Sequence, residues 1–163
     1  MGRGHGGEEE HMTRHGRHFW LGVLTAFVVA IAAGTARAEQ IQCQLHSIRA
    51  TTSGAQISPV LEPFRNFLLR PPLSSFTSFE LIGTRTVTLR QGANQPISLD
   101  HGIAGQITFA SSQGTQRVLN LSLRHQNRNL VNTTFRVSQG YPMFVVAGSV
   151  IPQGTLILGI VCR

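Results

Sequence analysis

Hydrophobic and polar residues alternate along most of the chain after residue 40, with the two-residue period that is typical of β-strands. In Leu119–Arg124, three leucines alternate with Asn120, Ser122 and Arg124. Similar alternation, or a short apolar run bounded by turn residues, occurs at 41–45, 79–81, 87–89, 97–99, 103–109, 131–137, 143–147 and 156–161. Strands at spacings of roughly 8–12 residues are typical of an antiparallel β-sandwich or barrel-like domain. We therefore predict a mainly β fold of about eight or nine strands.

The last stretch of the chain, Tyr141–Arg163, is expected to form a hairpin. Its two apolar runs, Met143–Ala147 and Leu156–Val161, flank a connector that contains glycine and proline. Short β-branched runs separated by such a connector are typical of paired strands. Because both runs are almost continuously apolar, we expect both strands at the centre of a sheet that is covered on both faces.

One segment has the pattern of a helix instead. Ser58 can cap its start, Pro59 fits the first helical position, and Pro71-Pro72 ends it. Apolar residues at 60, 61, 64, 67 and 68 form a stripe with the helical period. We predict one short amphipathic helix over about residues 59–69 and expect it to bury Leu61, Phe64 and Leu68 against the sheet.

Residues 1–38 have the pattern of a secretory signal peptide. Arginines precede the apolar run Phe19–Gly34, and the small-residue site Ala36-Arg37-Ala38 follows it. The run is shorter than the roughly 20 apolar residues that a spanning helix needs, so we favour cleavage after Ala38 over a retained anchor. The start codon is open between Met1 and Met12. We expect one domain over residues 39–163, secreted or periplasmic, with membrane contact only through the signal peptide before cleavage.

The sequence has two cysteines. Cys43 shares the phase of Ile41 and Leu45 in the first alternating segment, while His46 has the opposite phase. Cys162 ends the final hairpin. An exported protein meets oxidising conditions, so we predict a Cys43–Cys162 disulfide that joins the two terminal strands, with Cα atoms within about 7 Å of each other.

The positive charge of the predicted domain comes from arginine alone. Residues 39–163 contain ten arginines and four carboxylate side chains, a formal charge of +6, and the sequence has no lysine. Guanidinium groups pair bidentately with carboxylate and phosphate, so an anionic glycan, a lipid head group or an acidic envelope protein is the expected partner. Nucleic acid is disfavoured because no aromatic stacking platform accompanies the arginines.

Six arginines are candidates for an anion-binding face on a β-sheet: Arg85, Arg90, Arg117, Arg124, Arg128 and Arg136. The alternative is that arginine only solvates the outer faces of strands, since no run of five or more basic residues occurs.

Catalytic patterns are scarce. The four carboxylates fall on four different predicted elements, and no metal-ligand spacing or GxSxG motif occurs. Asp100-His101 is the one adjacent carboxylate–imidazole pair, and with Gly102 it favours a turn. We assign no catalytic residue, metal or cofactor. A hydrolase that uses Asp100 with His101 or His125 is the enzymatic alternative.

The order of several motifs resembles exported bacterial proteins of unassigned function. These are a strand with His and Ile near residue 41, an amphipathic helix, Ser78-Phe79-Glu80-Leu81, Leu89 with the Gly92 turn, Leu121-x-Leu123, Gly140-x-Pro142, Gly148, and Gly154-Thr155-Leu156-Ile157. The resemblance covers nearly all of residues 39–163. It implies export and one compact domain, and it transfers no site residue.

These observations together predict an exported, non-enzymatic β-domain that acts as an envelope or extracellular binding or accessory module. The second alternative, besides the hydrolase, is a structural subunit of a surface assembly that polymerises by strand addition. The predicted terminal disulfide disfavours that alternative, because it ties both end strands down.

Overall fold

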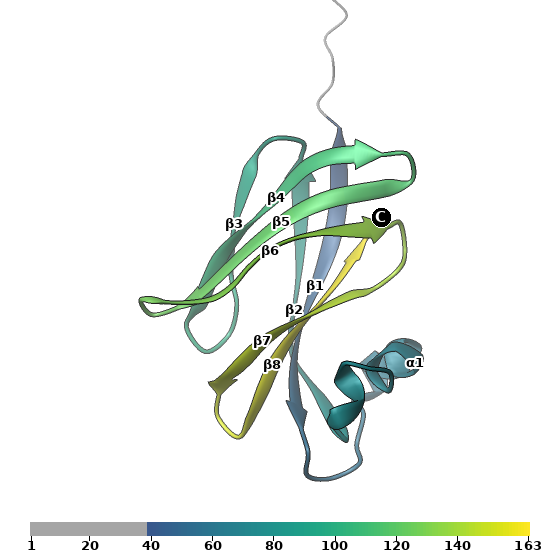
Figure 1. The fold of residues 1–163 in the computed structure, drawn as a ribbon, viewed down its shortest axis with the longest axis vertical. Helices are drawn as coiled ribbons and strands as arrows, with labels where there is room; N and C mark the ends of the chain where they lie inside the picture. Colours follow the sequence, from purple (N-terminus) through teal and green to yellow (C-terminus); the bar gives the residue numbers. More distant parts are fainter. Residues whose placement is uncertain (1–38) are drawn as a thin grey trace, which may run out of the picture. The chain divides into compact units, whose positions relative to one another are not determined.

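The computed structural model describes residues 39–163, so the predicted signal peptide lies outside the described residues. This part of the chain contains eight β-strands. They are β1 (Gln40–Thr51), β2 (Ser78–Arg90), β3 (Asn94–Ser98), β4 (Ile103–Gln113), β5 (Gln116–His125), β6 (Arg128–Ser138), β7 (Met143–Ile151) and β8 (Gly154–Cys162). Three short helical turns, described below, connect β1 to β2 (Figure 1).

The strands form two antiparallel sheets of four, which confirms the predicted fold class. Sheet A has the order β2-β1-β8-β7, and sheet B has the order β3-β4-β5-β6. One apolar cluster joins the facing sides of the two sheets. Leu45 and Leu158 contribute to it from sheet A, and Ile107 and Leu121 contribute from sheet B. The alternation of leucines in β5 therefore turns one face of that strand toward this core and the other toward solvent.

The final hairpin forms as predicted, but only one of its strands is central. β8 lies between β1 and β7, and its residues from Leu156 to Cys162 are all buried. β7 is an edge strand, so the prediction that both strands are central was wrong. Its side chains are mostly half-buried, Val146 is exposed, and the ladder is irregular around Gly148, whose φ is 96°. An apolar run alone does not distinguish an edge strand from a central one.

The predicted disulfide is present between β1 and β8. Cys43 lies directly opposite Cys162 in the register of the two strands, with the Cα atoms 4.0 Å apart. The bond closes a loop with a sequence separation of 119 residues. For a loop of that length, the chain-entropy model gives a stabilisation of about 5 kcal/mol.

The predicted helix is largely replaced by tighter turns. A 3₁₀ helix, η1 (Pro59–Phe64), runs into a single α-helical turn, α1 (Arg65–Leu68), and a second 3₁₀ turn, η2 (Leu73–Ser75), follows. Pro63 lies inside η1. Because proline lacks an N–H donor and clashes with the preceding turn, it prevents a continuous α-helix here.

The helical segment nevertheless covers part of sheet A on the side away from sheet B. Leu61 and Leu68 are fully buried as predicted, and they pack in a second cluster with Ile48 and Phe79. Phe64 is only half-buried at the margin of this cluster. Burial of the leucines, rather than helix propensity, therefore holds the segment in place.

Two neighbouring leucines provide a matched test of this packing. Leu68 is fully buried, whereas Leu69 is 46% exposed. We expect Leu68→Ala to lower the free energy of unfolding by about 2–5 kcal/mol, the usual cost of a buried Leu→Ala truncation. Leu69→Ala should change it by no more than about 0.5 kcal/mol. Urea denaturation of both variants measures the difference, and equal effects would contradict the described packing.

Candidate binding surfaces

The register of sheet A separates Arg85 from Arg90. Side chains directly opposite each other in antiparallel strands project from the same face. Arg85 lies opposite Leu45 and therefore has the phase of the core side, at the exposed edge strand β2. Arg90 lies opposite Gln40 and has the other phase. These two arginines thus project from opposite faces of sheet A.

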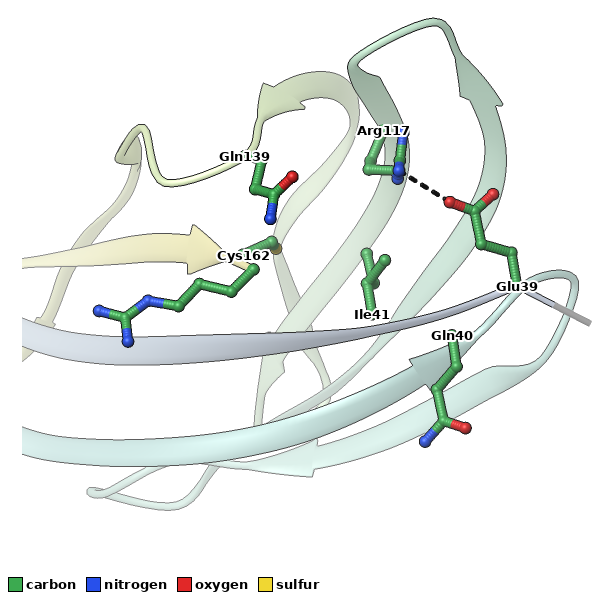
Figure 2. A pocket seen from close by; sticks show the side chains of 7 residues that line it. Glu39, Gln40, Ile41, Arg117, Gln139 and Cys162 are labelled. Atoms are coloured by element: carbon green, nitrogen blue, oxygen red, sulfur yellow. Dashed lines mark ion pairs between the residues drawn. The ribbon is translucent and has the colours of Figure 1, made fainter.

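Arg117 is engaged at one end of the sandwich. Its guanidinium forms an ion pair of 2.8 Å with Glu39, and Ser112 donates a hydrogen bond to the same carboxylate. The pair borders a pocket of about 210 Å³ whose lining also includes Ile41, Gln139 and Cys162. Figure 2 shows Arg117 and Glu39 directed toward each other at this pocket. Because its charge is balanced locally, Arg117 is a weaker candidate for an external anion than an unpaired arginine.

Arg124 and Arg136 share the solvent face of sheet B. Arg136 on β6 lies opposite Val118 on β5, which has the same phase as Arg124. The six residue steps from position 118 to position 124 span about 20 Å at the rise of a β-strand. Arg128 begins β6 opposite His125, which has the phase of the core side. The fold therefore places two of the six candidate arginines on one face and distributes the other four elsewhere.

Amide and hydroxyl side chains cover the face that carries Arg124 and Arg136. We define the outer face of sheet B by the solvent-phase residues of its strands: Asn94, Pro96, Ser98, Ala104, Gln106, Thr108, Ser111, Gln113, Gln116, Val118, Asn120, Ser122, Arg124, Asn129, Asn132, Thr134, Arg136 and Ser138. None of these residues carries a carboxylate or an aromatic ring. The alternation in β4, β5 and β6 indicated polar residues on this face, but it did not indicate which of them align across strands.

The alignment produces a row of alternating Asn and Thr that crosses all four strands. Asn94 on β3 lies opposite Thr108 on β4, which lies opposite Asn120 on β5, which lies opposite Thr134 on β6. Two hydrogen bonds join neighbouring pairs within this row. The Thr108 hydroxyl donates to Asn94 Oδ1 at 2.5 Å, and the Thr134 hydroxyl donates to Asn120 Oδ1 at 2.8 Å. These bonds leave the amide N–H₂ groups of both asparagines available as donors.

A hollow of about 290 Å³ lies on the same face beside Arg124. It is lined by Asn94, Pro96, Gly105, Gln106, Ser122, Arg124 and Asn129. Gly105 is required there because a Cβ at that position would come within 2.0 Å of the Ser122 carbonyl oxygen. The absence of a side chain thus allows β4 and β5 to approach closely below the hollow.

The carboxylate–imidazole candidates do not form a hydrogen-bonded pair. Asp100 points toward Gly83, where an added Cβ would lie 2.2 Å from Asp100 Oδ2. His101 is exposed in the turn with φ 61°, and no side-chain hydrogen bond within residues 39–163 joins Asp100 to His101 or His125. Asp100 and His101 instead form part of the turn that leads into β4.

His46 is a buried polar residue whose burial the alternation did not indicate. It lies on the helix-covered side of β1, is 4% exposed, and packs beside Phe64 with ring centroids 5.6 Å apart. Its Nδ1 lies 3.3 Å from the Thr84 hydroxyl, whereas its Nε2 has no hydrogen-bond partner among the described residues. Burial lowers the pKa of His46 below its ordinary value of 6.5, because the protonated ring would lose its hydration.

Comparison with known proteins identifies no relative: no family model, curated protein or solved structure matches the chain. In the described part of the chain, no group of three or more His, Cys, Asp or Glu residues could hold a metal ion. No helix there is long and apolar enough to cross a membrane. The candidate sites therefore have to be judged from their geometry.

The lowered pKa of His46 predicts how stability depends on pH. In the unfolded chain the imidazole takes up a proton near pH 6.5, while in the folded protein it does so only at lower pH. The free energy of unfolding should therefore be highest above about pH 6.5 and fall as the pH decreases from 7.5 to 5. Urea unfolding at several pH values measures this slope.

His46→Phe should reduce the slope, because the titrating group is gone. The control is His101→Asn, which changes an exposed histidine and keeps a residue that tolerates positive φ. An unchanged slope in His46→Phe would contradict this assignment.

Proposed function

We propose that the protein is an exported, non-enzymatic binding module whose partner is anionic. The observation that carries the proposal is the unequal pairing of its charges. Three of the four carboxylates of residues 39–163 each pair with one arginine: Glu39 with Arg117, Glu62 with Arg65, and Glu80 with Arg49. Export is supported by the signal-peptide pattern and is compatible with the disulfide.

The remaining guanidinium groups carry the excess charge. Within the described range, the arginines without an ion pair are Arg70, Arg85, Arg90, Arg124, Arg128, Arg136 and Arg163. All seven are exposed. An exposed guanidinium with no carboxylate partner retains its capacity for bidentate binding, and a summed positive field speeds encounter with polyanions.

The two alternatives have less support. The hydrolase would need Asp100 to orient a histidine, and their arrangement lacks that hydrogen bond. Strand addition by a detached terminal strand is disfavoured because β1 and β8 are central in sheet A and are joined by the disulfide. Binding of an acidic ligand to exposed arginines needs neither an Asp100–histidine hydrogen bond nor a detachable terminal strand.

The proposal predicts salt-dependent binding to an acidic polymer. The purified protein should bind polygalacturonate at low ionic strength and should not bind neutral dextran of similar length. Raising the salt from about 20 mM to about 500 mM should weaken binding at least about tenfold, because exposed charges are then screened within a few ångströms. Isothermal titration calorimetry measures the affinity for each polymer and its dependence on salt.

Absence of binding to any anionic polymer at low ionic strength would contradict the proposed function. Equal affinity for dextran and polygalacturonate would show that charge does not select the partner.

A further inference from the structure

We propose that the outer face of sheet B is the binding surface, and that its ligand is an extended acidic polysaccharide. This inference rests on the proposed anion-binding function and adds the site and the chemical class of the partner. This face combines two unpaired guanidinium groups with many neutral polar side chains and with the hollow beside Arg124.

The positions of the two arginines determine the length of the ligand. Arg124 and Arg136 lie about 20 Å apart along the strands, because Arg136 lies opposite Val118, six residue steps before Arg124 on β5. A phosphate, a sulfate or a single sugar acid can contact one of them at a time. A polymer with repeated carboxylates can contact both, and the second contact then forms at a high effective concentration.

The groups between the arginines match the hydroxyls of a sugar chain. The asparagine N–H₂ groups of the row from Asn94 to Thr134 can donate, and its threonine hydroxyl oxygens can still accept, so the row can exchange hydrogen bonds with sugar hydroxyls in either direction. The hollow beside Arg124, about 290 Å³, provides room for one sugar residue next to that guanidinium. A carboxylate on this residue would make a charge-assisted hydrogen bond.

Several of these side chains are already held in place. Thr108 and Thr134 bond to their neighbouring asparagines, and Arg136 Nε donates to Gln113 Oε1 at 3.2 Å. Side chains that are ordered before binding lose less conformational entropy when the ligand arrives. Sheet B itself is fixed by the core on its other face.

The composition of this face favours a polysaccharide over other polyanions. No aromatic ring is present among its residues, so nucleic-acid bases have no stacking platform. Its apolar residues are Pro96, Ala104 and Val118, which lack the large side chains with which proteins enter a lipid interface. Hydrogen bonding and charge are the interactions that remain, and an acidic sugar polymer uses both.

The experiment compares two double variants that change the net charge equally. Arg124→Gln with Arg136→Gln removes both guanidinium groups from the outer face of sheet B. Arg85→Gln with Arg90→Gln removes two exposed guanidinium groups from sheet A. Affinity for polygalacturonate should fall at least about tenfold in the first variant, and no more than about threefold in the second, because only the first loses charge-assisted contacts.

Ligand length provides the second measurement. Digalacturonate should bind the wild-type protein at least about tenfold more weakly than the polymer, because it cannot span both arginines. If the two double variants lose affinity equally, or if digalacturonate binds as well as the polymer, the inference is overturned while the proposed function stands.

Binding to other anions tests whether the ligand is a polysaccharide. Tighter binding to anionic phospholipid vesicles or to single-stranded DNA than to polygalacturonate would also overturn the inference. Failure to bind any of these probes at low salt would overturn the proposed function itself. Thermal unfolding of both double variants confirms that each remains folded under the conditions of the titrations.

Discussion

The pairing of β1 with β8 is the constraint on which the rest of the structure depends. The two strands come from opposite ends of residues 39–163, align over eight residue pairs, and are covalently joined where Cys43 faces Cys162. They form the centre of sheet A, so β2 and β7 can only add at its edges. With these four positions occupied, the intervening strands β3–β6 form their own sheet and pack their apolar face against the first.

The two sheets consequently have different outer faces. The helical segment covers part of sheet A, where Leu61 and Leu68 pack on Ile48 and Ile157. That cover buries a histidine beside Phe64, whereas Gln42, Gln44 and Thr86 remain exposed on the uncovered part of the same face. No helical element packs on sheet B among the described residues, so its outer face can display amide, hydroxyl and guanidinium groups to solvent. The proposed binding surface is placed on sheet B because its outer face carries the row from Asn94 to Thr134 and the hollow beside Arg124.

The sequence predicted the β class and the hairpin correctly because alternation is a local signal, and it predicted the disulfide because two cysteines allow only one pairing. The prediction of one continuous helix was less accurate. Pro63 lies inside the predicted segment, and a proline at an interior position breaks or kinks an α-helix in any protein. The prediction that β7 is a central strand was wrong, because an apolar run does not indicate how many neighbouring strands a strand has. Residue parity already placed Arg85 on the phase of Val87 and Arg90 on the other, so their separation could have been anticipated.

The proposed binding surface could not be predicted in detail from the sequence. The row from Asn94 to Thr134 depends on the register between four strands, and register is a tertiary property that bulges shift by a residue. One such irregularity lies between Phe109 and Ser111, and another lies next to Arg124. The burial of His46 likewise depends on a cover that comes from a different part of the chain.

The most direct test of this account is a nuclear magnetic resonance titration with polygalacturonate that follows the side-chain amide signals of asparagine and glutamine. The account predicts that the signals of Asn94, Gln106 and Asn120 move with ligand concentration. The signals of Gln42 and Gln44, which are exposed on β1 in sheet A, should stay in place. Shifts centred on Gln42 and Gln44, or shifts spread evenly over both sheets, would contradict it.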